Sequence, residues 1–468
     1  MGVFGALNSA VSGLRAQSFA LENISGNIAN SQTTGFKRQD TSFAEIVTDG
    51  GATQAVQNAG SVSAFSRATN DLQGNPIAVD QETFVAISGD GYFIVSEAVD
   101  VIDGNTIFNG QDFFTRAGDF NLSGEGFFEN GSGYFLQGFP LDPATGNQTG
   151  GLPEVIQIDT NQFLPAVPST LIEFQANLPS FPNTTTSDPN VAETELLAPS
   201  LRGEDLTAVP PVPAGDTGDA TIGADQTQLF LDSSIAGGST TLFTPLGDAV
   251  DIQFRFAKTE TALTAGNDDI YNLYFLSDNS ATGTDPAWTR VNQQYAFDTN
   301  GLLDPQIENV VINHRTVNGS NFGDVTVNHG VNGITQFSTP SGVASANVDA
   351  NGFPAGIFET VAISDGGRVT VTFSNDQSVD VAEIGLASFN ADSQLRRIDG
   401  GGAFAATALS GPPILGASGS ILGSTLEASN TDIADEFTKL IVTQQAYTAN
   451  SRVVTAADEL LTEVINIL

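Results

Sequence analysis

The sequence predicts a mainly β protein of several domains, with an α-helix at each end of the chain. Three observations carry this prediction. The chain has 468 residues, too many for one ordinary core. Its 49 glycines and 20 prolines favour many turns and therefore much β structure. All prolines lie between Pro76 and Pro413 and the last glycine is Gly423, so both ends lack proline and the final 45 residues lack glycine as well.

The N-terminal segment has the apolar spacing of an amphipathic helix. Apolar residues recur at steps of three, four or seven along one helical face: Leu7, Val11, Leu14, Leu21, Ile24 and Ile28. Asn30 and Gly35 then suit a helix end and the turn beyond it. Gly5, Gly13 and Gly26 each weaken a helix by up to about 1 kcal/mol relative to alanine. The helix is therefore predicted to be marginal alone in water.

The C-terminal segment keeps a heptad-like spacing over about six turns. Its apolar positions are Leu426, Ile433, Phe437, Leu440, Tyr447, Val454, Leu461 and Ile465. Asn430 or Thr431 is expected to cap this helix, and Asp432 suits its positive end. Either each helix packs on its own domain, or the two helices meet each other and neighbouring copies in a coiled-coil-like seam. The weakness of the first helix favours the seam and ordering on association.

The stretch between the helices predicts strands separated by turns. Residues 83–95 place β-rich runs on either side of Gly89-Asp90-Gly91, which predicts a hairpin. Residues 113–139 repeat this scheme with aromatic strands. Further strands are expected at 250–257, 270–276, 307–313, 358–363 and 368–374. The Pro/Thr/Ser/Asp-rich residues 179–220 are interpreted as a domain junction or long surface loops.

The composition argues against an enzyme. The chain has no cysteine and two histidines, which leaves thiolate sites, histidine metal sites and catalytic triads almost without residues. His314 and His329 are expected to be surface or hydrogen-bonded residues. No phosphate-loop lysine motif and no G-x-S-x-G elbow occurs. The acidic loops 103–112 and 278–285 lack the ligand positions of an EF-hand, so no catalytic, cofactor or metal residue is assigned.

The net charge of the chain limits the kinds of partner that it can bind. Fifteen basic and 54 acidic residues give a net charge of −39, which disfavours nucleic acid and anionic lipid. The acids are interpreted as a solvated coat that keeps the chain soluble. No run of eighteen apolar residues occurs, so no membrane insertion is expected. No cleaved secretory signal is visible at the N-terminus either.

Motifs at both ends match a known family. Asn27-Ile28-Ala29-Asn30 is followed by Thr34-Gly35-Phe36-Lys37, and Leu426-Glu427-Ala428-Ser429-Asn430 opens the C-terminal segment. Together with residues 89–95 and 114–139, these blocks resemble the bacterial flagellar rod and hook proteins. The resemblance covers roughly the first 140 and the last 45 residues. The motif residues assigned to the family's function are Asn27, Asn30, Thr34, Gly35, Phe36, Ser429 and Asn430.

Size separates the members of this family. The rod proteins are short, whereas here the residues from about 145 to 365 are inserted, and FQANLPS at 174–180 resembles a hook-protein signature. The resemblance therefore implies a hook subunit, with the distal rod protein as the alternative. An acidic extracellular β-rich adhesin is an alternative of another class. It would need a secretion signal or repeated acidic calcium motifs, and neither is found.

The resemblance also implies a nested domain order. Residues 1–72 with 425–468 would form a terminal helical assembly domain and linker, 73–148 with 366–424 a first β domain, and 149–365 the inserted outer β domain or domains. The two helices would line the inner layer of a helical tube that acts as a flexible universal joint and carries motor torque to the filament.

The resemblance implies the partners and the location as well. The chain would bind its own copies, the distal rod, the hook cap and the hook–filament junction proteins. It would leave the cell unfolded through the flagellar type III export apparatus, without a cleaved signal, and would lie in the extracellular hook. No cofactor and no enzymatic activity is expected.

Overall fold

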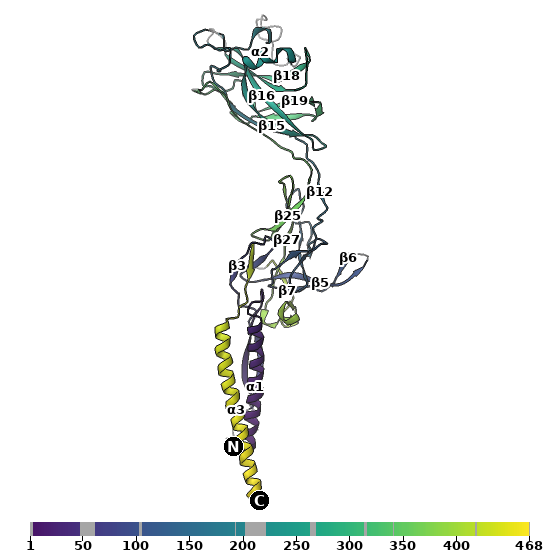
Figure 1. Ribbon diagram of the computed structural model, residues 1–468, viewed down its shortest axis with the longest axis vertical. Coiled ribbons are helices and arrows are strands. Elements are labelled where there is room, and N and C mark those ends of the chain that lie inside the picture. The colour runs from purple at the N-terminus through teal and green to yellow at the C-terminus, as the bar shows by residue number, and fades with distance from the viewer. Residues whose placement is uncertain are drawn as a thin grey trace. The chain divides into compact units, whose positions relative to one another are not determined.

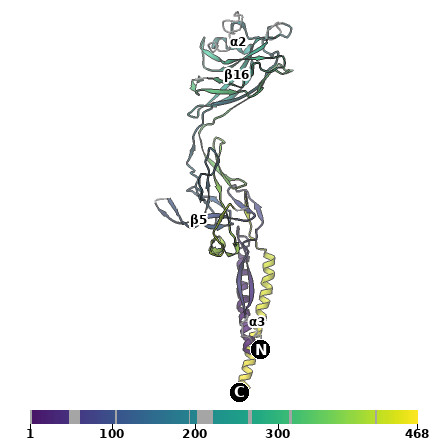
Figure 2. The same ribbon diagram turned by 180° about the vertical axis from the view of Figure 1, so that it is seen from behind.

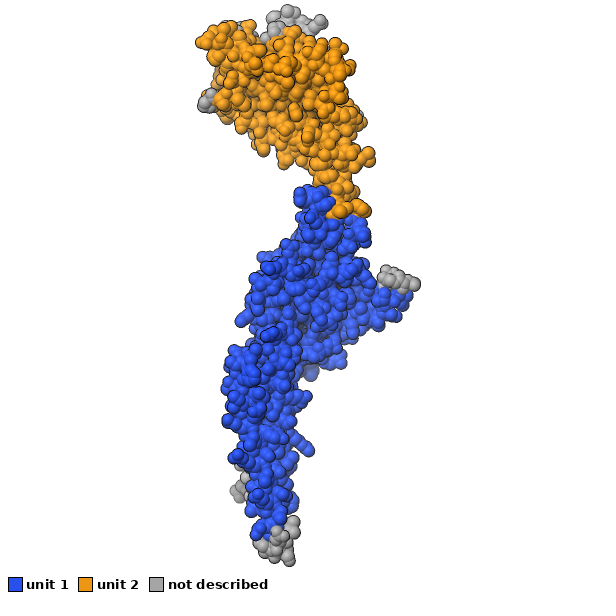
Figure 3. Space-filling model, in the orientation of Figure 1, with its two compact units in different colours: residues 1–162, 358–468 blue, residues 163–357 orange. Residues whose placement is uncertain are grey.

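The computed structural model describes residues 3–46, 61–102, 105–191, 193–201, 221–262, 268–312, 316–339, 341–416 and 419–467. They form two compact units, residues 1–162 with 358–468 and residues 163–357 (Figure 3). Most described residues are in or between strands, with long helices at the two ends, α1 (Val3–Ala29) and α3 (Ile433–Ile467) (Figure 1). The prediction of a mainly β chain with terminal helices is confirmed.

The first unit is built on a curved antiparallel sheet rich in aromatic residues. Its strands follow the order β25-β26-β27-β10-β5-β7-β30-β29. Their bounds are β25 (Gly356–Ile363), β26 (Arg368–Phe373), β27 (Ser378–Ile384), β10 (Tyr134–Pro140), β5 (Tyr92–Ile102), β7 (Phe113–Thr115), β30 (Ala403–Ala405) and β29 (Arg396–Ile398). Tyr92, Phe114, Phe389 and Phe404 pack edge to face in its core.

Short strand pairs complete this unit. They are β3 (Pro76–Ala78) with β33 (Thr425–Glu427), β4 (Val85–Ser88) with β32 (Ser420–Gly423), β28 (Leu386–Ser388) with β31 (Ile414–Leu415), β8 (Asn121–Leu122) with β9 (Phe128–Glu129), and β11 (Glu154–Val155) with β10. The hairpin predicted at 83–95 is wrong. Both of its strands form, but β4 pairs with β32 and β5 with β7 and β10, because the best buried partners lie far away in the sequence.

The second unit has two sheets that enclose one apolar core. One sheet has the order β14 (Thr221–Gly223), β18 (Pro286–Phe297), β17 (Asp269–Leu276), β16 (Ala249–Glu260) and β15 (Ile235–Phe243). The other has β19 (Asn309–Ile312), β22 (Val325–Asn328), β13 (Leu171–Asn177) and β23 (Ile334–Thr335), with β24 (Ser345–Ala350) also on β13. Smaller elements are β12 (Phe163–Leu164), β20 (Thr316–Val317), β21 (Ser320–Asn321) and α2 (Thr227–Asp232). The five strands expected at 250–257, 270–276, 307–313, 358–363 and 368–374 are all present, as β16, β17, β19, β25 and β26.

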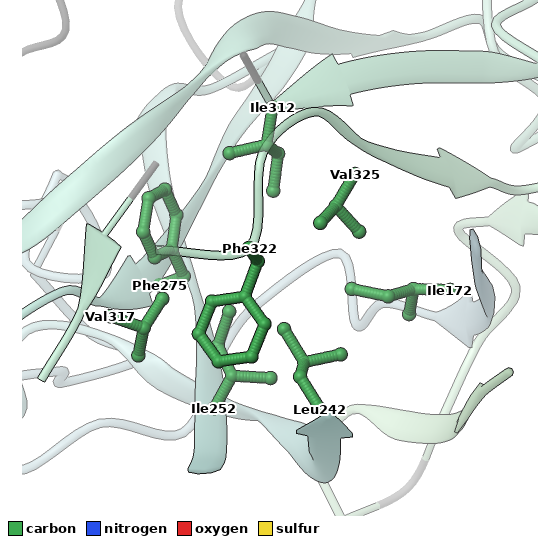
Figure 4. A pocket seen from close by; sticks show the side chains of 8 residues that line it. All are labelled: Ile172, Leu242, Ile252, Phe275, Ile312, Val317, Phe322 and Val325. Carbon is green, nitrogen blue, oxygen red and sulfur yellow. The ribbon is translucent and has the colours of Figure 1, made fainter. Parts of the chain in front are cut away.

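This core leaves no room for a ligand. Figure 4 shows eight apolar side chains that point toward one another between the strands: Ile172, Leu242, Ile252, Phe275, Ile312, Val317, Phe322 and Val325. The cavity among them is about 10 Å³, no more than one water molecule needs, and it offers no polar partner. It is a packed core and not a binding site.

The one described histidine is a core residue. The ring of His329 is buried, and its Nδ1 donates to the carbonyl of Phe174 at 2.9 Å while its Nε2 accepts from the Tyr295 hydroxyl at 2.9 Å. Burial lowers the pKa of His329 and keeps the ring neutral. The expectation of a hydrogen-bonded histidine is confirmed here, and His314 lies outside the described residues.

Candidate functional site: the terminal helices and their buried junction

The two terminal helices lie side by side and run in opposite directions (Figures 1 and 2). Near one end, Asn27 Nδ2 donates to Glu436 Oε2 at 3.1 Å. About four turns on, Gly13 lies against Asn450, so close that a β-carbon on Gly13 would be 2.9 Å from Asn450 Nδ2. We call the contact between α1 and α3 the helix seam. It brings together the two segments that the sequence assigned to assembly.

The helix seam is lined by small and polar side chains. On α1 the buried residues are Ala10, Gly13, Ala16, Ala20, Ile24 and Asn27, and on α3 they are Glu436, Thr443 and Ala457. The α3 residues Glu436, Thr443, Asn450 and Ala457 recur every seven residues, which keeps them on one face against α1. Small residues allow the two backbones to approach closely, but they remove little apolar surface from water.

Most apolar residues predicted for assembly flank the helix seam. Ile24 is buried, and the others on α1 are only partly buried: Leu7, Val11, Leu14, Leu21 and Ile28. On the C-terminal side Leu426, Leu440, Val454 and Leu461 are partly buried, and the Ile465 side chain lies outside the described residues. The heptad interpretation placed these residues at the centre of the contact. The structure places smaller residues there.

The rest of the predicted C-terminal stripe is exposed to solvent. Phe437 is 48% exposed, and Ile433 and Tyr447 are exposed to a similar degree. Of the exposed apolar residues of α3, Ile433, Tyr447, Val453 and Leu460 lie three or four residues from a seam residue and flank the seam. Phe437, Ile441 and Val442 are turned away from it, and we call them the outer face of α3. Each such side chain gives roughly 1.5–3 kcal/mol when it is buried. Within this chain the outer face of α3 does not gain that energy.

A two-stranded ribbon that the sequence did not predict covers another side of α1. It consists of β1 (Gln39–Ile46) and β2 (Ser61–Ala68), which pair in register from Gln39↔Ala68 to Ile46↔Ser61. Ser12 Oγ accepts from the Val62 amide at 3.2 Å, and Asn23 bonds both Thr41 and Ser66. Serine and asparagine are weaker helix formers than alanine, but here they hold the ribbon against α1.

A buried carboxylate joins segments near the two ends of the chain to the β-sheet part of the first unit. Glu427 Oε1 accepts from Lys37 Nζ at 2.5 Å and from the Gly74 amide at 2.8 Å, and Oε2 lies 3.3 Å from Arg116 Nη1. Lys37 Nζ also donates to the carbonyl of Leu72 at 2.7 Å. All three charged side chains are buried. Burial lowers the pKa of Lys37, and the adjacent Glu427 opposes this shift.

The family-motif residues surround this carboxylate. Gly35 donates its amide to the carbonyl of Glu427 at 2.8 Å. Its φ of +66° and the Ala117 amide, 2.5 Å from where a β-carbon would lie, both require glycine. Asn430 Oδ1 accepts from the Arg38 amide at 2.8 Å, and Asn430 Nδ2 donates to the carbonyls of Thr69 and Leu72. The core of this arrangement, which we call the buried junction, is Lys37, Arg116, Glu427 and Asn430 with Gly35.

The remaining motif residues have smaller roles at the same place. Asn27 forms two bonds with the backbone of Gln39, so it fixes the exit from α1. Phe36 is buried with the Arg397 guanidinium 4.8 Å from its ring centre. Asn30 bonds the carbonyl of Gly26, Ser429 accepts from the Thr431 amide, and Thr34 is partly buried.

The cap of α3 differs from the expected one. Asp432 Oδ1 accepts from the amides of Ala434 at 2.8 Å and Asp435 at 3.2 Å, so Asp432 is the N-cap. Asn430 and Thr431, expected as caps, precede it, and Asn430 is committed to the buried junction. The prediction was wrong because the sequence shows several capping residues in a row but not which one a tertiary contact has taken.

The three charged residues of the buried junction were missed as a group. Lys37 is one of three lysines and Glu427 lies inside the motif, but Arg116 is far from both in the sequence. One signal was available in the sequence. A charged residue that lies within an apolar, turn-rich segment is expected to be buried, and a buried charge needs a partner of opposite charge. In the part of the chain that the structure describes, no cluster of three or more acids and histidines could hold a metal ion.

Comparisons with known proteins show what these features are similar to. Residues 7–37 match the model of the flagella basal body rod protein, and residues 423–467 match that of the flagellar basal body rod FlgEFG protein C-terminal region. These two stretches contain most of α1, the whole of α3 and most of the buried junction. A flagellar hook protein FlgE of Brucella suis is 27% identical over 473 residues, which cover the whole of both chains. The chain is similar to flagellar hook proteins over its full length.

Other flagellar hook proteins also match this chain over nearly its full length. FlgE of Escherichia coli is 28% identical over 99% of this chain and 100% of its own, and that of Salmonella typhimurium is 27% identical over 98% and 99%. A crystal structure of Helicobacter pylori flagellar hook protein FlgE2 covers 75% of this chain and 100% of its own, with 16% identity and a TM-score of 0.46. No enzyme is among these relatives. Among the described residues, no helix is long and apolar enough to cross a membrane.

Proposed function

We propose that the chain is the structural subunit of a flagellar hook. Its copies assemble into a helical tube, with α1 and α3 in the inner layer and the β units outside, and the tube bends while it transmits torque. Full-length similarity to hook proteins supports the hook over the shorter rod proteins. The same similarity disfavours the adhesin alternative.

The outer face of α3 carries this proposal. A helix whose inward side is small and polar and whose outward side holds Phe437, Ile441 and Val442 is half of an interface. A second copy supplies the missing wall, and each copy then leaves its own outer face for the next. Repetition of one such heterologous contact produces an open helical assembly.

The nested order of the domains is part of the proposal. The terminal helices form the assembly domain, residues 73–148 with 366–424 the first β domain, and the residues from 149 to 365 the outer part. The buried junction supports this order, because it ties residues from both ends of the chain to Arg116 of the first β unit. A rigid link of this kind passes a load from the inner helices to the β domains.

The proposed partners and route are those of the family. Beyond its own copies, the subunit contacts the distal rod at one end of the tube and the hook cap or the hook–filament junction proteins at the other. It reaches the extracellular hook unfolded, through the flagellar export apparatus.

Truncation tests the proposed function. We expect a chain ending at residue 432 to keep folded β units, because Glu427 and Asn430 remain, and to form no tubes in electron microscopy. A chain ending at residue 426 is the sharper comparison, because it loses the buried junction as well and its first unit should also be destabilised. Abundant tubes from either truncation would contradict the proposal.

A further inference from the structure

A buried lysine and two buried acids lie together in the second unit, which is orange in Figure 3. Lys258 lies on β16, Asp269 begins β17, and Glu195 lies in a turn before β14. We call these three residues the lysine cluster. Lys258 Nζ and Asp269 Oδ1 are 2.8 Å apart, and the two side chains are 1% and 11% exposed. Water is therefore almost excluded from this ion pair.

Glu195 is the member of the lysine cluster that structure alone does not explain. The residue is fully buried, and neither Oε1 nor Oε2 has a hydrogen-bond partner among the described residues. A buried carboxyl group without a partner costs free energy, and such groups are rare in folded proteins. A role other than stabilisation of the fold is therefore needed to account for Glu195.

Two observations place Glu195 beside the ion pair. Leu197, two residues further on, donates its amide to the carbonyl of Lys258 at 2.7 Å. Tyr271 is the partner of Lys258 in the register of β16 and β17. Burial raises the pKa of Tyr271, and the negative charges of Asp269 and Glu195 raise it further. Both carboxyl groups therefore lie near the strands that Lys258 and Tyr271 pair.

Hydrogen bonds hold the two side chains of the ion pair in place. Lys258 Nζ also donates to the carbonyl of Ser180 at 2.6 Å. Asp269 Oδ1 accepts from the Ala262 amide at 2.7 Å, and Oδ2 accepts from Gln336 Nε2 at 2.9 Å. Because Nζ is 2.8 Å from Oδ1, it lies within about 4 Å of the carboxyl carbon, one C–O bond further on. Donors to both oxygens stabilise the negative charge that develops when an amine attacks this carbon.

We propose that Lys258 and Asp269 join in an amide bond, and that Glu195 moves a proton in this reaction. One proton first passes from Nζ to the carboxylate of Asp269, which leaves a neutral amine beside a neutral acid. Nζ then attacks Cγ, and its second proton passes through Glu195 to the departing oxygen. The C–N bond forms and the C–O bond breaks. The products are the amide and one water molecule, so no oxidant and no further reactant is needed.

The buried site favours this reaction. A neutral amine and a neutral acid need less hydration than two ions, so the first transfer is helped where water is excluded. Groups that a fold holds in contact react at effective concentrations of about 10⁵–10⁸ M, which allows an amide to form in an aqueous medium. The bond ties β16 to β17 in a chain that has no cysteine for a disulfide. It forms within one folded subunit, so it does not depend on the proposed assembly.

Mass spectrometry of the purified full-length chain tests for the bond directly. The folded chain should be lighter than its sequence by one molecule of water. Trypsin cuts after lysine and arginine, so an unlinked chain yields residues 256–258 and 259–290 as separate peptides. The linked chain should yield residues 256–290 as one peptide that lacks one water, because the amide blocks cleavage at Lys258. A folded chain that yields both separate peptides at full mass would overturn the proposal.

Four substitutions separate this bond from an ordinary ion pair. Lys258→Arg keeps the positive charge but lacks the amine, so the chain should keep its full mass. Asp269→Asn should form the same amide with loss of ammonia in place of water. Glu195→Gln cannot carry the proton and should slow linkage at least about a hundredfold, whereas Glu193→Gln, at an exposed neighbouring site, should leave it unchanged. A loss of water that persists in Lys258→Arg, or equal linkage in Glu195→Gln and the unaltered chain, would overturn the proposal.

Discussion

The core of the second unit and the helix seam are two opposite ways to hold chain segments together. The second unit buries large apolar residues such as Phe174, Phe254 and Tyr295 between its sheets and satisfies His329 internally. The helix seam buries Gly13, Ala20 and Thr443 and leaves larger apolar residues on the outer face of α3 in water. The first arrangement is complete within one molecule. We propose that the second is completed by further molecules that cover it.

The buried junction differs from both of these arrangements. It is polar, but unlike the helix seam its contacts lie within the chain, because Lys37 and Arg116 pair with Glu427 and Asn430 bonds the backbone of Arg38, Thr69 and Leu72. We therefore expect the boundary between the self-sufficient and the dependent part of the subunit to lie near residues 38 and 430. The helices beyond it depend on assembly.

A charge on the outer face of α3 should have the largest effect. Phe437→Asp replaces an exposed ring by a carboxylate, so the monomer should lose less than about 0.5 kcal/mol of stability. In the proposed tube the same site would be buried, and the lost burial of about 1.5–3 kcal/mol should raise the critical concentration for assembly at least tenfold. Sedimentation of tubes measures this.

Its matched control lies on the exposed surface of the second unit. Leu246→Asp alters an apolar side chain that is even more exposed than Phe437 and should leave assembly near the normal level. Equal assembly of the Phe437→Asp and unaltered chains would remove the distinction between the two regions.

The next largest effect should come from the buried junction. Glu427→Gln keeps the shape of the side chain but leaves Lys37 and Arg116 buried without a counter-charge, which costs about 3–5 kcal/mol. Urea unfolding should show the loss in the first unit and not in the second. Glu154→Gln, at an exposed site of the same unit, should change nothing measurable. A loss below about 1 kcal/mol at Glu427 would show that the junction does not hold the unit together.

A pair of glycines tests how tight the helix seam is. Gly26→Ala meets no atom within 4 Å and should stabilise α1 by up to about 1 kcal/mol, the difference in helix propensity. Gly13→Ala has the same propensity gain but places a β-carbon 2.9 Å from Asn450, so it should give less stability or none. The helical circular dichroism of tubes on heating compares the two. Equal gains would mean that α1 and α3 do not approach closely at Gly13.

The smallest effect should appear in the second unit on mild acidification. Burial lowers the pKa of His329, so below about pH 6.5 the unfolded chain binds a proton that the folded unit does not. The free energy of unfolding should therefore fall as the pH falls through this range. His329→Gln should lose this part of the pH dependence, and an unchanged slope in the variant would contradict the role given to the ring.

The comparison also shows what could be predicted from the sequence. Periodicity and local composition can be seen in the sequence itself. They were enough to predict the terminal helices and the strands β16, β17, β19, β25 and β26. The partner of β4, the cap Asp432 and the pairing of Lys37 with Glu427 depend on contacts between distant segments. The centre of the helix seam was missed for a related reason, because small residues give no apolar signal and are recognised only when the opposite helix is in place.

Amide hydrogen exchange of dilute monomer and of assembled tubes tests the central claim most directly. We expect amides in α1 and α3 to exchange in the monomer orders of magnitude faster than those of β16 and β17, and to become protected in the tube. Amides near Gly35 and Glu427 should be protected in both states. Monomeric helices as well protected as the core strands of the second unit would contradict the claim that these helices are completed by other copies.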